Sequence, residues 1–487
     1  MYLYFFWVNF LVYRHIMDRM SDTMQKKHKK RKGDRGKYAN LDDIPDDIIV
    51  GILSLLPLKE AVATSVLSSR WRYLWRFTRM SLDFDVDHVT PKYGTLTCPS
   101  HVTKYLNKNR KSYIRWVNEV VDQHSGAIES LRVCYYLRRR HKKHIDRWIR
   151  FGLRSNVLER LELDFSERYP FCNDMKRYLY KFFPNFFCVK YVGFRTMKVL
   201  SLRHVSIRGE EIEYLLSNAT LLERLVLEEC QNLSHLRVCG HSLALKNLEI
   251  VATGRNLRRV EICDLVNLVS FYFKGDFKNY ARNFILRNLP LLVDFHIGPS
   301  NFSRDLFSYF SCWLPQIQFL RMTDIPKRRL SSNYDYEYPI LPNIERVHYT
   351  LVHCGLENCG GLRNLRFIMK AFPNLKRLEL HVPSYDHSYS DRNRHNWPAE
   401  VPNCPHYQLK EVEIFSYNYF LGDMERVLYL IKHAVALEKI IVNCKCNQRL
   451  KRFKTKQQLF EAEEISKSHA MTQLQPQIPS HIEFILR

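Results

Sequence analysis

Glycine and proline are scarce in this chain, with 16 and 19 residues among 487. Their scarcity excludes a collagen-like chain and argues against a fold dominated by loops. A hydrophobic content of 46%, with 13% aromatic residues, also excludes a mostly disordered chain. The length allows two or three domains, or one long array of repeats.

Cysteine is sparse as well, because 13 residues scattered along the chain are too few for a disulfide framework. Only Cys354/Cys359 and Cys444/Cys446 form close pairs, and neither pair has a partner at the spacing of a zinc site. We therefore expect reduced core thiols, no bound metal and a reducing compartment, the nucleus or the cytoplasm or both.

Sequence motifs of catalysis are missing too. The chain has no GxxxxGK[ST] phosphate loop, no GxSxG nucleophile elbow, no HExxH helix and no GxGxxG element. Its 20 histidines are dispersed, and no cysteine lies in a setting typical of a catalytic thiol. We predict no catalytic residue, no cofactor and no enzyme activity of the chain itself.

A hydrophobic run long enough for a membrane span is also lacking. The apolar stretch Tyr2–Tyr13 has about 12 residues, whereas a span needs about 20. It has neither the basic flank nor the cleavage site of a signal peptide. We expect no membrane partner and a working start at Met17, Met20 or Met24; a weak membrane anchor is the alternative.

Positive charge is concentrated in three runs. Residues 24–37, 138–150 and 449–456 carry +7, +6 and +5 of the net charge of +25. The rest is close to neutral, so we expect no nucleic-acid partner, although a scaffold that binds nucleic acid through these runs is an alternative. Residues 1–40 are predicted to be a disordered basic arm, in which Lys26–Lys32 is either a nuclear-localisation run or a solvated tail. Residues 138–143 are predicted to be a solvated loop.

Order is expected to begin near Leu41, in the segment LDDIPDDIIVGILSLLPLKEAVATSVLSSRWRYLW. Pro45 suits the first turn of a helix, and the apolar residues from Ile48 to Leu56 recur at helical spacing. Two further short helices are predicted over Lys59–Val66 and Arg70–Arg76. Three such helices cannot hide this many large apolar side chains, so the surplus implies a partner surface.

The stretch Ile44–Trp75 resembles an F-box of the plant type, in the pattern I-P-D-D-I-I-x-x-I-L-S-x-L-P-L-K-E-A-V-x-T-S-V-L-S-x-R-W-R-x-L-W. The resemblance implies docking on the Skp-type adaptor, and through it on the cullin, of a Skp–cullin–F-box ubiquitin ligase. Some of the predicted adaptor contacts must instead form the small core, and the sequence does not separate the two sets. The predicted contacts are Ile44, Pro45, Ile48, Ile52, Leu53, Leu56, Pro57, Val62, Val66, Leu67, Trp71 and Trp75.

A second pattern, L-x-x-L-x-L or its apolar equivalent, follows the F-box segment. It begins at Leu158, Met197, Leu222, Leu245, Leu268, Leu292, Ile317, Ile344, Leu375, Leu409 and Leu437. The steps from Met197 to Ile344 are 23 to 27 residues, which is the spacing of leucine-rich repeats. Further copies at Leu233 and Leu257 lie half a period away, so part of the convex face is predicted to be extended.

Positions 1, 4 and 6 of such a strand are predicted to be buried, and positions 3 and 5 to lie exposed on the concave face. The predicted concave residues are Val199, Ser201, Arg203, Arg224, Val226, Asn247, Glu249, Ser270, Tyr272, Asp294, His296, Phe319, Arg321, Arg346, His348, Arg377 and Glu379. This mixture is typical of a protein-recognition surface. Because arginine pairs with carboxylates and phosphates and is frequent at binding hot spots, the predicted target contacts are Arg203, Arg224, Arg321, Arg346 and Arg377.

The remaining segments complete a predicted α/β fold, a three-helix F-box followed by a curved leucine-rich-repeat solenoid. A helix over 113–121, a strand over 131–136 and a helix over 144–153 follow the order of plant F-box/leucine-rich-repeat proteins. Residues 409–442 resemble the FBD module that closes many of them, and a solenoid needs such a terminal cap. The predicted domains are an F-box at 41–80, a linker at 81–109, a solenoid at 110–404, an FBD-like cap at 405–447 and a polar tail at 448–487.

These features predict a substrate-recognition subunit of a Skp–cullin–F-box ubiquitin ligase. The F-box would bind the adaptor, and the repeats would hold a target protein, so that catalysis comes from proximity alone. Two alternatives remain at this point. One is a ligand-sensing F-box receptor in which a small acidic molecule completes the concave face, and the other is an interaction scaffold outside any ligase.

Overall fold

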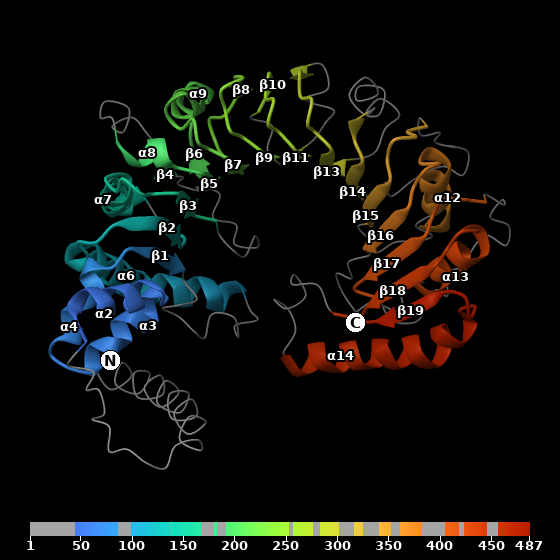
Figure 1. Ribbon diagram of the computed structural model, residues 1–487, viewed down its shortest axis with the longest axis horizontal. Helices are drawn as coiled ribbons and strands as arrows, with labels where there is room; N and C mark the ends of the chain where they lie inside the picture. Colours follow the sequence, from blue (N-terminus) through green and yellow to red (C-terminus); the bar gives the residue numbers. More distant parts are fainter. Residues whose placement is uncertain are drawn as a thin grey trace, which may run out of the picture.

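The computed structural model describes residues 44–85, 99–137, 139–166, 180–182, 191–252, 257–275, 283–300, 316–324, 340–351, 361–381, 405–417, 423–445 and 456–487. The chain forms an arc that starts at a helical N-terminal unit and ends at a C-terminal helix and strand (Figure 1). The predictions for residues 1–43, the apolar start and the basic arm, lie outside the described residues. No helix in these described ranges is long and apolar enough to cross a membrane.

The N-terminal unit is built from short helices. They are α2 (Asp46–Ser54), α3 (Leu58–Ala63) with the 3-10 turn Thr64–Val66, and α4 (Trp71–Leu74) with the 3-10 turn Trp75–Phe77. Pro45 and Pro57 directly precede α2 and α3, with φ angles of −57° and −56°. The proline ring fixes φ near this value, so both residues favour the turn that starts a helix.

Within the described residues, fourteen parallel strands form the main sheet, which follows the inner side of the arc (Figure 1). In spatial order they are β1 (Met80–Asp85), β2 (Ile128–Cys134), β3 (Arg160–Asp164), β5 (Val199–Arg203), β7 (Arg224–Glu228), β9 (Asn247–Ala252), β11 (Ser270–Gly275), β13 (Asp294–Ser300), β14 (Phe319–Asp324), β15 (Arg346–Leu351), β16 (Arg377–His381), β17 (Glu411–Phe415), β18 (Lys439–Asn443) and β19 (Glu483–Leu486). Each of the eleven predicted L-x-x-L-x-L segments from Leu158 to Leu437, the half-period copies aside, contributes one strand to this sheet, which confirms the repeat prediction.

Apolar ladders hold the strands together. Leu200, Leu225 and Leu248 are partners in register on β5, β7 and β9, and all three are buried. Farther along, the rings of Phe271 and Phe295 stack 5.7 Å apart. Each repeat alone could not bury its apolar face, so these rows are what makes the array stable.

The outer side of the arc is mixed, with helices at both ends and strands in the middle. The helices are α6 (Pro99–Gln123), α7 (Lys142–Leu153), α8 (Gly193–Thr196), α9 (Gly209–Asn218), α12 (Gly361–Ala371) and α13 (Asp423–His433). Between them β8 (His235–Cys239), β10 (Arg259–Cys263) and β12 (Phe284–Arg287) form a parallel second sheet, and β4 (Tyr180–Lys181) pairs with β6 (Val205–Ser206). The second sheet confirms the prediction of an extended convex segment at Leu233 and Leu257.

Three segments differ from the sequence-based assignment. All of β1 except Met80 lies inside the predicted linker, where alternating apolar side chains reach the core, and α6 begins eleven residues before the predicted solenoid. The predicted tail forms α14 (Lys456–His469), a π turn (Ala470–Leu474), a 3-10 turn (Gln475–Gln477) and β19, which pairs with β18. The predicted basic loop contains the 3-10 turn Arg139–His141 and the first turn of α7.

Backbone hydrogen bonds join the N-terminal unit to the solenoid. The N–H groups of Ser125 and Gly126 both donate to the carbonyl of Arg76 at 2.8 Å, and Met80 N–H donates to Ala127 at 3.1 Å. A side chain at Gly126 would lie 2.2 Å from the carbonyl oxygen of Thr78. The chain approaches itself so closely here that only glycine fits.

Side-chain amides connect successive repeats at the foot of the sheet. Asn267 and Gln316 each stand directly before the first apolar residue of a repeat and donate to the carbonyl of Leu243 or Leu289 in the repeat before, at 3.0 and 2.6 Å. Asn374 makes the same contact with Pro342 at 2.9 Å. These hydrogen bonds satisfy carbonyl groups that accept no hydrogen bond from the strands of the sheet.

Candidate adaptor and target surfaces

The N-terminal unit exposes a group of large apolar side chains, here called the F-box apolar face. Leu55 is 84% exposed, and Phe77, Val66 and Ile48 are each more than half exposed. The face consists of Ile48, Ile52, Leu55, Val66, Leu67, Tyr73 and Phe77. Water contact with this much apolar surface is unfavourable, so the face is a candidate docking surface.

Helical geometry separates this face from the core. In α2, Ile48, Ile52 and Leu55 follow at steps of four and three residues and therefore share one side of the helix. Ile49 and Leu53, with no exposed surface, occupy the opposite side. The ion pair of Arg70 with Asp46, at 2.6 Å, ties α4 to the start of α2.

The predicted adaptor contacts divide into two groups. Leu53, Trp71 and Trp75 are at most 6% exposed and belong to the core, because the helices bury them against one another. The predicted residues that reach the surface, fully or in part, are Ile44, Pro45, Ile48, Ile52, Leu56, Pro57, Val62, Val66 and Leu67. Sequence reasoning missed Leu55, Tyr73 and Phe77, although the three-residue step from Ile52 to Leu55 was a signal for the first of them.

On the concave face, positions 3 and 5 of the strands carry most of the polar side chains, as predicted. Three of the predicted residues at these positions, however, are buried. Ser201 and Val226 are 6% and 2% exposed, and Glu379 is 4% exposed. Ser201 and Val226 are short side chains in register between Glu162 and Glu249. Glu379 is covered by the arginines of neighbouring positions. The prediction that these three residues are exposed is therefore wrong.

All five predicted target-binding arginines make ion pairs with carboxylates inside the molecule. Arg203 lies 3.1 Å from Glu228, and Arg224 lies 3.5 Å from Glu249. The other three, Arg321, Arg346 and Arg377, join a larger network farther along the sheet. The arginines are thus held in defined positions, and the concave face is close to charge-balanced.

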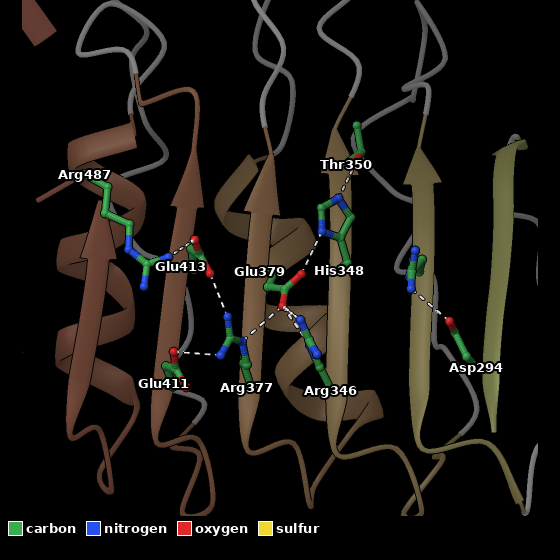
Figure 2. A network of polar contacts seen from close by, with 10 residues as sticks. Asp294, Arg346, His348, Thr350, Arg377, Glu379, Glu411, Glu413 and Arg487 are labelled. Carbon is green, nitrogen blue, oxygen red and sulfur yellow. Dashed lines mark hydrogen bonds and ion pairs between the residues drawn. The ribbon is translucent and has the colours of Figure 1, made fainter. Parts of the chain in front are cut away.

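Figure 2 shows the larger network, which runs across the strands from Asp294 to Arg487. Arg321 donates to Asp294 at 2.9 Å. Glu379 accepts from Arg346, from Arg377 at 3.1 Å and from His348 at 3.0 Å.

The network continues towards the C-terminus through acidic residues of β17. Arg377 also reaches Glu411 at 2.9 Å and Glu413 at 2.7 Å. Arg487, the last residue, lies 3.4 Å from Glu413. Because one guanidinium bridges three carboxylates, β16 and β17 are fixed relative to each other.

Burial and pairing act in opposite directions on Glu379. Burial raises the pKa of this carboxyl, but hydrogen bonds from His348 and Arg346, together with their charges, lower it to about 2. The carboxylate therefore stays ionised at any ordinary pH. A buried anion that accepts several charge-assisted hydrogen bonds orients its donors firmly.

Aromatic rings gather beside this network. The rings of Tyr272 and His296 stack at 4.0 Å. Burial, with the charge of Arg321 as the next cause, lowers the pKa of His296 to about 3, so the imidazole is neutral. Phe319 lies between the guanidinium groups of Arg321 and Arg346, whose central carbons are 4.5 and 4.4 Å from the ring centre.

The two halves of the concave face differ in character. Among the described strands, those from β1 to β9 carry charged pairs and short side chains at positions 3 and 5, and those from β11 to β17 add the aromatic rings. Aromatic side chains and arginine dominate binding hot spots in proteins. The later half is therefore better suited to hold a partner.

Sites for metals or for nucleophilic chemistry do not stand out. Within the part of the chain that the structure describes, no group of three or more His, Cys, Asp or Glu could hold a metal ion. Burial raises the pKa of the thiols of Cys230 and Cys263, to about 12 and about 11, which makes them poor nucleophiles. Cys354, Cys359 and Cys446 lie outside the described residues.

The helical unit and the repeat array together define a class of protein, an F-box joined to a leucine-rich-repeat domain. An F-box domain model matches residues 41–79, and the model described as "At1g61320/AtMIF1, LRR domain" matches residues 120–486. The second match covers more than half of the chain, which therefore belongs to the At1g61320/AtMIF1 LRR domain family. Neither matching model describes an enzyme.

Relatives of Arabidopsis thaliana agree with this assignment. The chain is 25% identical over 449 residues to the FBD-associated F-box protein At5g38590, covering 86% of this chain and 97% of the relative. It is 24% identical over 417 residues to the FBD-associated F-box protein At4g10400, covering 82% and 90%. It is 32% identical over 234 residues to the F-box/LRR-repeat protein At3g03360, covering 44% and 43%. These names confirm the resemblance to plant F-box, leucine-rich-repeat and FBD proteins.

Proposed function

We propose that the chain is the substrate-recognition subunit of a Skp–cullin–F-box ubiquitin ligase in the nucleus, the cytoplasm or both. The F-box apolar face binds the Skp-type adaptor, which connects it to the cullin, and the concave sheet holds a target protein. The observation that carries the proposal is the set of exposed apolar side chains on an F-box unit that backbone hydrogen bonds join to a repeat array.

The chain itself performs no bond-making step in this proposal. It brings the target close to a ubiquitin-conjugating enzyme carried by the cullin, which raises the effective concentration of the target lysines. Rigid attachment matters for such a mechanism because the gain depends on orientation as well as distance. β1 supports this, since it follows the F-box directly and is the first strand of the main sheet.

Charge placed on the F-box apolar face tests the adaptor contact. Ile52→Asp with Leu55→Asp should abolish binding of the full chain to a Skp-type adaptor in a quantitative pull-down. Each side chain contributes about 1.5–3 kcal/mol when buried, so the loss is at least a hundredfold. Both positions are exposed, so circular dichroism should show an unchanged fold.

A matched control and a second readout complete the test. Val435→Asp changes an apolar residue that is 65% exposed at the other end of the chain, and it should leave adaptor binding intact. Adaptor binding that survives the double change on the F-box apolar face would refute the assigned surface. Adaptor binding without recruitment of a cullin would support a scaffold outside any ligase.

A further inference from the structure

The charges of the concave network lie in two layers. Arg321 and Arg346 are 40% and 44% exposed, whereas their partners Asp294 and Glu379 are 18% and 6% exposed. The same holds for Arg377, at 31%, above Glu413, at 4%. The carboxylates thus form a floor, and the surface that a partner meets consists of guanidinium groups.

These guanidinium groups keep hydrogen-bond donors for a partner. Arginine has five N–H bonds. Arg346 uses its Nε and Nη2 groups on Glu379, and Arg321 uses Nη2 on Asp294. Among the described residues, the Nη1 groups of Arg321 and Arg346 donate to no acceptor, whereas the Nε group of Arg321, also without an acceptor, is buried and out of a partner's reach.

Phe319 fixes how the two groups point. Its ring lies within 4.5 Å of the central carbon of Arg321 and within 4.4 Å of that of Arg346. Such cation–π contacts occupy the flat faces of the guanidinium groups and leave their edges, where the N–H bonds are, for other contacts. The carboxylates below set the position and the ring sets the tilt, so the donors are preorganised before any partner arrives.

We propose that Arg321, Arg346 and Arg377, with Phe319 between the first two, form a docking site for an acidic segment of the target protein. The site, called here the arginine platform, rests on the proposed function and names the chemistry that the target must present. Carboxylate or phosphate oxygens of the segment accept the remaining N–H bonds, while its apolar parts contact Phe319.

Geometry favours a segment over a small molecule. The three arginines come from the adjacent strands β14, β15 and β16, and neighbouring strands lie about 4.8 Å apart, so the platform extends over about 10 Å. A small acid could engage one or two of these groups at a time. An extended chain with several acidic side chains engages all three.

Synthetic peptides of defined charge can stand in for the target segment. The full chain, bound to its adaptor, is titrated with fluorescent peptides of equal length that alternate glycine with glutamate, phosphoserine, glutamine or lysine, and anisotropy is measured at two salt concentrations. Binding should occur with the glutamate or the phosphoserine peptide and weaken with salt. Whichever of the two binds more tightly identifies the acidic group.

Two variants locate the binding. The double change Arg321→Gln with Arg346→Gln should weaken the binding of the acidic peptides at least a hundredfold. Each charged contact contributes about tenfold or more to the affinity. Arg321→Lys with Arg346→Lys keeps the charge above Asp294 and Glu379, and therefore the fold, but removes the forked donors, so several-fold weakening is expected. Arg259→Gln changes an arginine of the outer strand β10 that is 52% exposed and paired with Glu261, and it should have little effect.

Three results would overturn the proposal. They are failure of both acidic peptides to bind, equal binding of the glutamine peptide, and an equal loss in Arg259→Gln. Adaptor binding measured in the same preparations keeps this test separate from the proposed function. A complex that retains its adaptor but does not bind acidic peptides contradicts the arginine platform and does not contradict the substrate-recognition role.

Discussion

Replacing Gly126 with alanine should loosen the joint between the F-box and the solenoid. The added methyl group would lie 2.2 Å from the carbonyl oxygen of Thr78 and 2.7 Å from the carbonyl carbon of Phe77, so the backbone must move by about 1 Å to reach ordinary contact distance. Overpacking of this kind costs about 1–3 kcal/mol. The shift also strains the two hydrogen bonds to Arg76, at about 1 kcal/mol each, so we expect a local loss of about 2–4 kcal/mol.

Hydrogen exchange measures this loss where it occurs. In Gly126→Ala the amides of Ser125, Gly126 and Met80 should exchange about 30- to 1,000-fold faster, with smaller changes in the distant strands. Gly51→Ala is the matched control, because nothing lies within 4 Å of the added methyl group on exposed helix α2, and it should stabilise by about 0.5–1 kcal/mol. Wild-type exchange at Ser125 in Gly126→Ala would refute the close approach described here.

Two further predictions concern the sheet. The folded-state pKa of His296 is about 3, below its unfolded value of about 6.5, so the protein loses stability as pH falls from 6.5 towards 3. In chemical unfolding, His296→Gln should remove up to about 2 kcal/mol of the stability loss between pH 6.5 and 5. The exposed His235→Gln should leave this loss unchanged. An unchanged pH dependence in His296→Gln would contradict the buried neutral imidazole. Asn267→Ala should lower the free energy of unfolding by about 1 kcal/mol, because the side chain no longer donates to the carbonyl of Leu243. If its thermal midpoint is no lower than that of the variant Asn247→Ala, whose side chain is exposed, the inter-repeat hydrogen bond does not contribute.

The strands of the main sheet were predictable because their pattern repeats. A buried residue at positions 1, 4 and 6, recurring every 23 to 27 residues, fits a parallel strand and little else. The outer sheet was predictable for the same reason, since half-period copies at Leu233 and Leu257 leave no room for helices. Regular spacing, rather than the identity of single residues, carried these predictions.

The two ends of the sheet escaped the same reasoning. β1 has alternating Met80, Leu82 and Phe84 without the repeat pattern, and β19 follows a Gln-rich stretch that reads as polar. Ile482, Phe484 and Leu486 alternate at strand spacing and were a usable signal. A terminal strand has one neighbour only, so its sequence is less constrained than that of an inner strand.

The candidate surfaces were predictable in kind but not in detail. Sequence could place Trp71 and Trp75 in the F-box segment, yet their burial depends on how three short helices pack. In the same way, the spacing placed Glu379 on the concave face, but only the neighbouring strands bring Arg346 and Arg377 over it. Contacts between strands far apart in sequence decide which side chain lies uppermost.

In the ligase that we propose, the unbroken strand order also has a consequence for which lysines of a target can receive ubiquitin. Eight steps of the sheet separate β1, next to the F-box, from β14, where the arginine platform begins, a path of about 40 Å at about 4.8 Å a step. The number of repeats therefore fixes the reach between the anchored end and the captured segment. Deleting one repeat would shorten this reach by about 5 Å and turn the target with the twist of the sheet, so under the proposed function a variant with one repeat fewer would present different lysines of the same target.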